Sequence, residues 1–394
     1  MGHSAFLFRI RFRFPNVSAT ARPALTSKVS VPFVAGGLLR RIRHQHDVSG
    51  EGGVYYRSAM RKLILRNFQS PGDIVMLTAA VRDLHRAHPG EFLTDVRTSC
   101  PALWAHNPHI TPLAEDDPGV ELIDCHYPLI HRSNQVPCHF LHGFAAHLNE
   151  QLGLSIRVTE FKGDIHISDE ERGWFDRVET KFGSGRPFWL LVSGGKHDFT
   201  IKWWDPVRMQ QVVHYFRDRF DFVQVGEAGH HHPPVEGVVD LRGVTSLRQL
   251  VRLVYHAQGA VTPISLLMHL TAAVDTKPGA PKNRPCVVIA GGREPPHWTA
   301  YPHHQFIHTV GALRCCDNGG CWRSRTLPLG DGDEKDRPEA LCVDVVGTLP
   351  RCMDMITADE VIRRIDLYFA GGALDAQPPA ARAGFSQEPH AVHT

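Results

Sequence analysis

Hydrophobic and polar positions follow two alternating periods from residue 62 onward. In residues 74–88, Ile74, Leu77 and Val81 are spaced three or four positions apart, which predicts one apolar face of a helix. The short apolar runs on either side of it are typical of strands. For the first half of the chain the pattern predicts strands at 62–68, 92–98 and 120–126 and helices at 74–88 and 139–153.

The same alternation restarts after the glycine-containing stretch KFGSGRP at 181–187. Strands are expected at 188–196, 221–227, 258–263 and 284–292, and helices at 205–220, 246–257 and 265–274. Alternating strands and helices predict parallel sheets covered by helices, so the expected fold class is α/β, with two facing Rossmann-like, doubly wound domains. Ligands of such sheets bind beyond the carboxyl ends of the strands, so functional residues are expected in the turn after each strand.

Changes in pattern and composition divide the chain into six segments. The first residues show no sustained period, and the last are rich in Ala, Pro and Gly. We expect an extension at 1–59, Rossmann-like domains at 60–180 and 181–310, a cysteine-rich segment at 311–356, a helix at 357–370 and a disordered tail at 371–394.

The charges are distributed unevenly. Residues 1–59 carry nine Lys or Arg against Asp47 and Glu51, and subtracting these from totals of 43 and 41 leaves 34 basic and 39 acidic side chains, a net charge of −5 for the rest. That balance argues against nucleic-acid binding. The leading segment is Arg-rich and acid-poor like a transit peptide, but we favour an upstream extension before a working start at Met60. No apolar run approaches the roughly 20 residues that span a bilayer.

Asp73 stands in the turn SPGD between a predicted strand and a predicted helix. In that position its carboxylate can satisfy free N–H groups at the helix N-terminus. It can also face the cleft and take a proton from an acceptor hydroxyl as a general base. The sequence leaves both interpretations open.

The loop SGGKHDFTIKWWDP at 193–206 joins a glycine turn to Lys196 and Lys202. Glycines let backbone N–H groups approach a phosphate, and a nearby ammonium offsets the charge of a departing diphosphate. The alternative is a surface loop whose lysines are solvated.

The stretch TPISLLMHLTAAV at 262–274 leads through Ser265 into a predicted helix that bears Met268 and His269. A helix N-terminus attracts anions through its free N–H groups and its dipole, which favours a nucleotide site here. A lone histidine on such a helix is more often a core or capping residue, so the role of His269 stays open.

These three motifs, in this order over roughly residues 62–310, resemble glycosyltransferase family 9, the bacterial heptosyltransferases. The resemblance implies a GT-B fold with an acceptor domain followed by a nucleotide-sugar domain, in a cytoplasmic bacterial enzyme. It also implies inverting transfer of heptose from ADP-heptose to a hydroxyl acceptor, with no catalytic metal. By motif, Asp73 matches the proposed base and Lys202 of TIKWW the residue that contacts the diphosphate. The part of the third motif that holds the nucleotide sugar is matched by Ser265, Met268 and His269.

The third motif also departs from the family pattern. Ile264 stands where the family has an aspartate, and Leu266 where it has a glycine. Contacts made by the missing carboxylate must come from elsewhere, so the resemblance does not fix the donor sugar. The alternative function is a non-catalytic nucleotide-sugar or metal-sensing binding protein on the same scaffold. An NAD-dependent oxidoreductase is disfavoured because no turn reads GxGxxG.

Five of the nine cysteines lie between residues 315 and 352. Glycines 319 and 320 permit a tight turn that lets neighbouring thiolates face one ion, and four thiolates suit tetrahedral zinc or an iron centre. The expected ligands of this structural metal are Cys316, Cys321, Cys342 and Cys352, with Cys315 as a competing ligand. Disulfides, a redox centre and incidental thiols are the alternatives. A subset of heptosyltransferases that modify autotransporter proteins carries an iron-binding cysteine finger, and this segment is similar to it. The similarity implies an acceptor other than the lipopolysaccharide core, namely a protein or another hydroxyl, such as that of a glycan.

Overall fold

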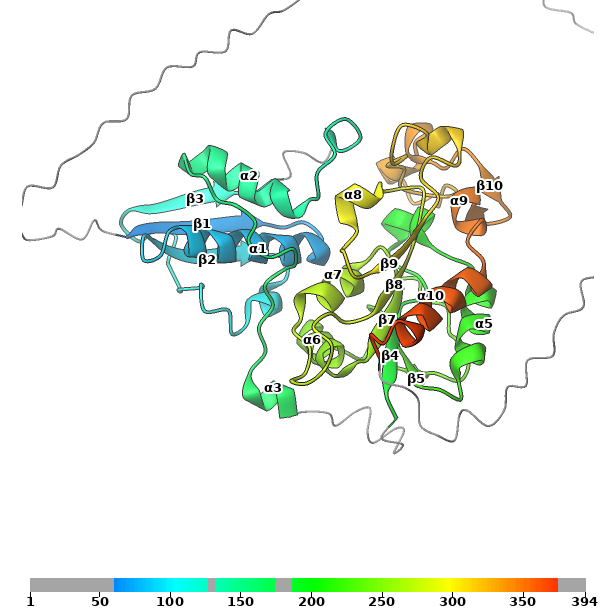
Figure 1. Ribbon diagram of the computed structural model, residues 1–394. Helices are drawn as coiled ribbons and strands as arrows, with labels where there is room; N and C mark the ends of the chain where they lie inside the picture. Colours follow the sequence, from blue (N-terminus) through cyan, green and yellow to red (C-terminus); the bar gives the residue numbers. More distant parts are fainter. Residues whose placement is uncertain (1–59, 127–131, 174–185, 375–394) are drawn as a thin grey trace, which may run out of the picture. The chain divides into compact units, whose positions relative to one another are not determined.

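The computed structural model describes residues 60–126, 132–173 and 186–374 (Figure 1). The extension predicted at 1–59 and residues 375–394 of the tail predicted at 371–394 lie outside these residues. Within the described part, no helix is both long enough and apolar enough to cross a bilayer.

The first half forms a three-stranded parallel sheet in the order β2-β1-β3. Its elements are β1 (Arg61–Asn67), α1 (Pro71–Ala87), β2 (Phe92–Thr98), β3 (Val120–Asp124) and α2 (Leu141–Leu152). The predicted helical spacing is confirmed, because Ile74, Leu77 and Val81 are fully buried on α1. α2 ends where Gly153 adopts a left-handed conformation with φ 68°, as glycine readily does at a helix C-terminus.

The second half forms a six-stranded parallel sheet in the order β6-β5-β4-β7-β8-β9. The strands are β4 (Phe188–Leu191), β5 (Asp221–Gln224), β6 (Val239–Asp240), β7 (Gly259–Pro263), β8 (Cys286–Gly291) and β9 (Gln305–His308). In chain order this is 3-2-1-4-5-6, the doubly wound arrangement in which the direction of winding reverses between the first and fourth strands. The reversal falls between β4 and β7, which pair directly.

Helices cover both faces of this second sheet (Figure 1). α6 (Leu247–His256) and α7 (Leu266–Ala273) lie on one face, and α5 (Pro206–Phe216) and α10 (Ala358–Ala370) on the other. The remaining helices of this half and of the segment before it are the short α3 (Asp169–Gly173), α8 (Pro296–Thr299) and α9 (Arg351–Asp354). Because side chains alternate along a strand, Trp189 and Leu191 of β4 join a core with α5 and α10. The intervening Leu190 joins the core formed with α6 and α7. The predicted α/β class with parallel sheets is therefore confirmed.

Four short strands were not predicted. β6 and the antiparallel pair β10 (Val345–Val346) and β11 (Leu349–Pro350) have two residues each, too few to show a period, and the four residues of β9 begin and end with polar side chains. The boundary of the predicted tail is also wrong for residues 371–374. Leu374 is buried in the core with α10, and its N–H donates to the Tyr368 carbonyl at 3.2 Å.

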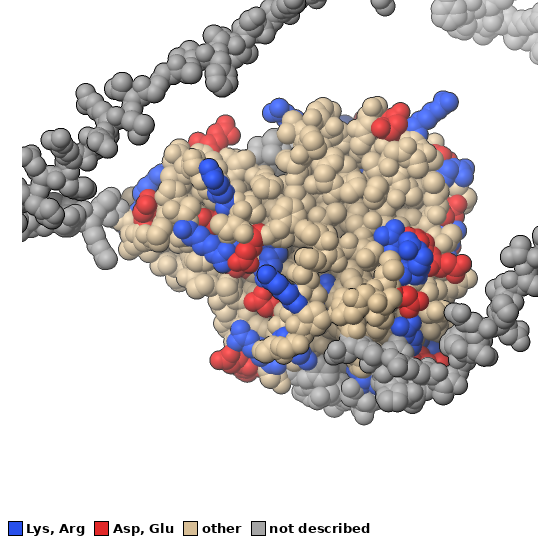
Figure 2. All heavy atoms as spheres, in the orientation of Figure 1, with Lys and Arg blue, Asp and Glu red and all other residues tan. Residues whose placement is uncertain are grey.

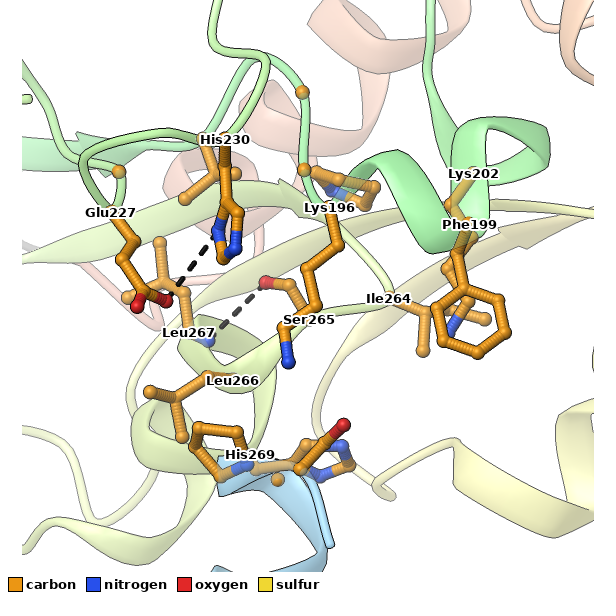
Figure 3. A pocket seen from close by; sticks show the side chains of 18 of the residues that line it. Lys196, Phe199, Lys202, Glu227, His230, Ile264, Ser265, Leu266, Leu267 and His269 are labelled. Carbon is orange, nitrogen blue, oxygen red and sulfur yellow. Dashed lines mark hydrogen bonds and ion pairs between the residues drawn. The ribbon is translucent and has the colours of Figure 1, made fainter. Parts of the chain in front are cut away.

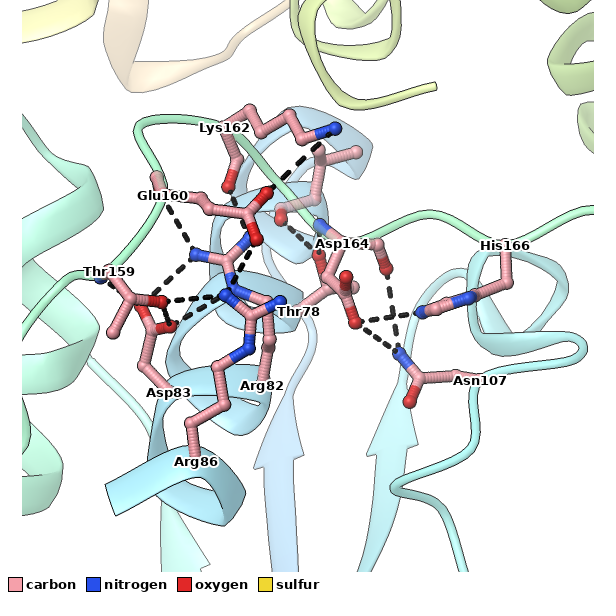
Figure 4. Close-up of polar contacts among 11 residues, drawn as sticks. Thr78, Arg82, Asp83, Arg86, Asn107, Thr159, Glu160, Lys162, Asp164 and His166 are labelled. Carbon is pink, nitrogen blue, oxygen red and sulfur yellow. Dashed lines mark hydrogen bonds and ion pairs between the residues drawn. The ribbon is translucent and has the colours of Figure 1, made fainter. Parts of the chain in front are cut away.

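A buried ion pair ties the connection between the two sheets to α1 (Figure 4). Arg82 and Asp83 are 1% and 0% exposed and bond to each other, with Arg82 Nε 3.0 Å from Asp83 Oδ1. The guanidinium also donates to the carbonyls of Glu160 and Lys162 at 2.9 Å. Asp83 accepts from the N–H and the hydroxyl of Thr159 at 3.2 and 2.6 Å. We call Arg82 and Asp83 the α1 ion pair.

Candidate active site

A cavity of about 670 Å³ lies at the carboxyl ends of β4, β5, β7 and β8 and at the N-termini of α1 and α6. Its position matches the strand-order reversal, where doubly wound sheets bind their ligands. Of the residues predicted to act, Asp73, Lys202, Ser265 and His269 all line it. Figure 3 shows Lys196, Ser265 and His269 around one part of this cavity and Phe199 with Lys202 at another.

Asp73 occupies the third position of α1, and its carboxylate Oδ2 accepts the Ser70 N–H at 2.9 Å. The capping interpretation is thus part of the observed geometry. The same side chain lines the cavity, and it lies near enough to Lys202 for its charge to raise the pKa of that ammonium. Asp73 can therefore cap α1 and face the cavity at the same time, so the two interpretations left open by the sequence do not exclude each other.

Gly72, next to Asp73, brings the N-terminus of α1 against α7. A Cβ on Gly72 would stand 2.8 Å from His269 Cδ2, so only glycine allows this approach. His269 Nδ1 pairs with the Tyr301 hydroxyl at 2.9 Å, and that hydroxyl also contacts Met76 Sδ at 3.4 Å. Burial lowers the pKa of His269 to about 3, so its imidazole is neutral at pH 7.

Ser265 caps α7, and its Oγ accepts the Leu267 N–H at 3.2 Å. Met268 is fully buried and lies outside the cavity lining, so the structure does not bring it to the predicted site. Met268 directly precedes His269, and consecutive residues of a helix point about 100° apart, so Met268 faces the core while His269 faces the cavity. The two residues that depart from the family pattern, Ile264 and Leu266, do line the cavity and give it an apolar wall.

Lys202 ends the turn η3 (His197–Lys202), and its Nζ lies 2.7 Å from Glu294 Oε1. Arg293 Nη1 bonds to the same carboxylate oxygen. Burial lowers the pKa of Lys202, although the charge of Glu294 opposes that shift. Burial acts to raise the pKa of Glu294, but the two cations outweigh it and hold that pKa below its usual range. We call Lys202, Arg293 and Glu294 the cavity triad.

Sequence reasoning missed several residues that line the cavity. They are Glu227, His230, Arg293, Glu294 and Trp322. Arg293 and Glu294 directly follow β8, so the rule that ligands bind after the strand ends could have indicated them. Glu227 and His230 lie after β5, with Oε2 3.4 Å from Nδ1 (Figure 3).

The cysteines of the 311–356 segment lie near one another, beside the end of β8. A Cβ on Gly292 would stand 3.2 Å from Cys316 Sγ and 3.3 Å from Cys352 Cβ. Burial raises the pKa of Cys352 to about 12, and the nearby Cys321 and Cys342 thiols add to this rise. These soft thiol donors are of the kind that zinc and iron prefer. Across the described residues, however, no three His, Cys, Asp or Glu side chains are arranged to hold a metal ion. The predicted metal finger is therefore not shown.

Comparison with known proteins supports the fold. No family model and no curated relative matches the sequence. Among solved structures, a glycosyl transferase family 9 protein of Veillonella parvula matches with 14% identity and a TM-score of 0.55, over 79% of this chain and 98% of that one. E. coli ADP-heptose lps heptosyltransferase II matches with 15% identity and a TM-score of 0.51, over 80% and 100%.

A third similar structure is the iron-containing dodecameric glycosyltransferase TibC of enterotoxigenic E. coli. It matches with 16% identity and a TM-score of 0.52, over 79% of this chain and 76% of that one. At such identities the likeness concerns the fold. This chain has the two-sheet α/β fold of family 9 glycosyltransferase structures, as the motifs predicted.

Proposed function

We propose that the protein is a family 9 type glycosyltransferase that moves a sugar from a nucleotide-activated donor to a hydroxyl of a protein or glycan. The observation that carries this proposal is the convergence of Asp73, Lys202 and the Ser265 end of α7 on one cavity at the strand-order reversal. A volume of about 670 Å³ suits a nucleotide sugar, since small-molecule sites usually occupy about 300–1,000 Å³. ADP-heptose is the first donor to test, because TibC, which shares the fold, has been solved in complex with ADP-D-beta-D-heptose.

In the proposed reaction, an acceptor hydroxyl oxygen attacks the anomeric carbon on the face opposite the diphosphate. The new C–O bond forms as the bond to the diphosphate oxygen breaks, and the electron pair leaves with the diphosphate, which inverts the anomeric centre. Asp73 accepts the hydroxyl proton. The ammonium of Lys202 and the positive end of the α7 dipole stabilise the charge that develops on the leaving group.

His269 contributes as a neutral group in this proposal. Its buried imidazole carries no charge at pH 7, so it offers the donor a hydrogen-bonding or packing surface and leaves the net charge of the cavity unchanged. Its contact with Gly72 also sets the spacing between α7 and the turn that bears Asp73. Ile264 and Leu266 form an apolar wall of the cavity, and a sugar hydroxyl placed against that wall would find no hydrogen-bond partner in their side chains.

Replacing Asp73 by Asn tests the proposal. The amide keeps the shape of the side chain but cannot accept the proton, so transfer should fall by about 10²- to 10⁴-fold, the usual contribution of a general base. ADP release is the readout, with calorimetric ADP binding as the control that the donor site is intact. Unchanged transfer would remove Asp73 from the reaction. ADP binding without transfer to any acceptor, by the unmodified protein, would favour the non-catalytic binding protein instead.

We also propose that Cys316, Cys321, Cys342 and Cys352 bind a structural iron or zinc ion. The proposal is supported by their proximity and by the iron content stated for TibC. Cys321→Ser should lose the metal and lower the unfolding midpoint, whereas Cys138→Ser, which lies outside this segment, should do neither. Metal analysis of the purified protein decides the matter, since a wild-type protein without stoichiometric iron or zinc would exclude the site.

A further inference from the structure

Two charged residues of the cavity triad, Arg293 and Glu294, have no role in the function proposed above. Both follow β8 and line the cavity beside Lys202. Their side chains are only 11% and 7% exposed, against 21% for Lys202. Burying three charged groups together is costly unless each is paired or serves a ligand, so their arrangement calls for an explanation.

The guanidinium of Arg293 is held between two aromatic rings. Its Cζ lies 4.8 Å from the centre of the Phe199 ring and 5.5 Å from that of Trp322. Nε donates to the Arg323 carbonyl at 2.7 Å, and Nη1 bonds to Glu294. Among the described residues Arg293 Nη2 has no hydrogen-bond partner, so this nitrogen is available to donate to a ligand.

The main chain of the cysteine-rich turn fixes this arrangement. The Trp322 N–H donates to the Arg293 carbonyl at 3.1 Å, and the Cys321 N–H donates to the Gly292 carbonyl at 3.1 Å. A Cβ on Gly320 would stand 2.3 Å from the Arg293 oxygen, so glycine is required at that close approach. Trp322 itself has φ 56°, an uncommon conformation for a bulky residue that persists only where the surroundings enforce it.

Asn134, from the first half of the chain, holds the other side of the same turn. Its Nδ2 donates to the Gly320 carbonyl at 2.9 Å, and its Oδ1 accepts from the Gly320 N–H at 3.1 Å and from the Trp322 indole at 3.0 Å. The ring that covers Arg293 is therefore fixed from two directions. A guanidinium held this firmly loses little conformational entropy when it binds a ligand.

The cavity triad has two cations and one carboxylate, so it carries a net charge of +1. We propose that Arg293 is a second diphosphate-binding cation of the cavity, and that Glu294 is a positioning residue that holds Arg293 and Lys202 side by side. This inference rests on the proposed transferase function. The planar fork of arginine suits two phosphate oxygens, whereas the ammonium of Lys202 acts as a point charge. As the bond to the anomeric carbon breaks, both cations face the charge that appears on the diphosphate.

The test compares ADP with adenosine, which lacks the diphosphate, by titration calorimetry. Arg293→Ala should raise the Kd for ADP by about 10- to 100-fold, as expected for a lost hydrogen bond to a charged group, and leave the Kd for adenosine unchanged. Arg293→Lys should restore part of the ADP affinity because it keeps the charge without the fork. Arg363→Ala, an exposed arginine on α10, serves as the matched control.

The outcomes separate this inference from the proposed function. If the wild-type protein binds neither ADP nor inorganic pyrophosphate, both fail. If it binds ADP and transfers the sugar while Arg293→Ala binds ADP as tightly as the wild type, only the inference fails. An equal loss of ADP and adenosine affinity would mean that Arg293 merely shapes the cavity, which also overturns it.

Glu294→Gln tests the positioning role through a pH profile. The charged and titratable groups that act on Lys202 are Glu294, Arg293, Asp73 and His269. Burial lowers the pKa of Lys202, and the negative charge of Glu294 raises it. Without that charge, the pKa of Lys202 should fall further. ADP binding by Glu294→Gln should then be lost at a lower alkaline pH than in the wild type. A superimposable profile from a folded variant would reduce Glu294 to a packing role.

Discussion

Two buried groups of charged side chains in this protein differ in how completely their polar atoms are paired. In the α1 ion pair, Asp83 accepts two bonds from Arg82 and two from Thr159, while Arg82 also donates to two backbone carbonyls (Figure 4). In the cavity triad, Glu294 forms ion pairs with both Lys202 and Arg293, and within the described residues Arg293 Nη2 has no hydrogen-bond partner.

The difference is one of net charge and of remaining hydrogen-bonding capacity. The α1 ion pair carries no net charge, and both of its side chains are hydrogen-bonded to their surroundings, so we call it closed. Its bonds to residues 159–162 fix the course of that segment over α1. The cavity triad has a surplus positive charge and faces a cavity of about 670 Å³. Burial alone therefore does not identify a binding site, and incomplete pairing beside a cavity is the more informative feature. Elsewhere charges are dispersed, and Figure 2 shows acidic and basic side chains interspersed on the face drawn.

The largest expected effect comes from breaking the α1 ion pair. Arg82→Ala leaves the fully buried Asp83 carboxylate without its cation, which should lower the free energy of unfolding by about 3–5 kcal/mol. ADP affinity of the folded protein should not change, because Arg82 lies outside the cavity lining. Urea unfolding followed by circular dichroism measures the first quantity and calorimetry the second.

Arg86→Ala is the matched control on the same helix. Arg86 also contacts Thr159 and Glu160, but its side chain is 45% exposed. Exposed ion pairs contribute about 0–1 kcal/mol, so this variant should be nearly as stable as the wild type. Equal losses for Arg82→Ala and Arg86→Ala would show that the closed, buried pairing is not what distinguishes the α1 ion pair.

The second test breaks the cavity triad. It should lower ADP affinity with little loss of stability, the reverse of the result expected for Arg82→Ala. Lys202→Ala removes a cation but leaves Glu294 paired with Arg293, so the unfolding free energy should change much less than in Arg82→Ala. ADP affinity should fall by about 10- to 100-fold because a charged hydrogen bond to the ligand is lost. Lys62→Ala, a lysine on β1 outside the cavity, controls for the loss of charge alone. A large loss of stability with unchanged ADP affinity would mean that the cavity triad is structural after all.

Much of the fold could be predicted because the relevant signals are local. Ile74, Leu77 and Val81 repeat at helical spacing, and a four-residue apolar strand such as β4 lies between turn residues, so each element is recognisable from a short window. Two-residue β6 offers no such window, and its pairing with β5 depends on tertiary contacts. Leu374 stands near the start of a stretch rich in Ala, Pro and Gly that has no period, and its packing with the α10 core depends on tertiary contacts.

The candidate site could be predicted only in part. Asp73, Lys202 and Ser265 follow strand ends in recognisable motifs, and the structure gathers them at one cavity. Met268 shares a motif with His269, but the helical turn directs it into the core. Trp322 lies far along the chain within the cysteine-rich segment, and its backbone bond to Arg293 and its indole bond to Asn134 bring it to the cavity. Long-range contacts of this kind leave no periodic trace in a sequence.

The smallest expected effect comes from removing a single hydrogen bond to the α1 ion pair. Thr159→Val removes the hydroxyl that donates to Asp83 at 2.6 Å but keeps the backbone N–H and the Arg82 bonds. The free energy of unfolding should fall by about 1–2 kcal/mol, less than for Arg82→Ala, because the buried carboxylate loses one of four hydrogen bonds and keeps its cation. Thr159→Ser retains the donor and should recover most of that loss in the same urea titrations. If Thr159→Val is as stable as Thr159→Ser, the hydroxyl bond contributes nothing, and the contrast between a closed pair and an open triad rests on the ionic contacts alone.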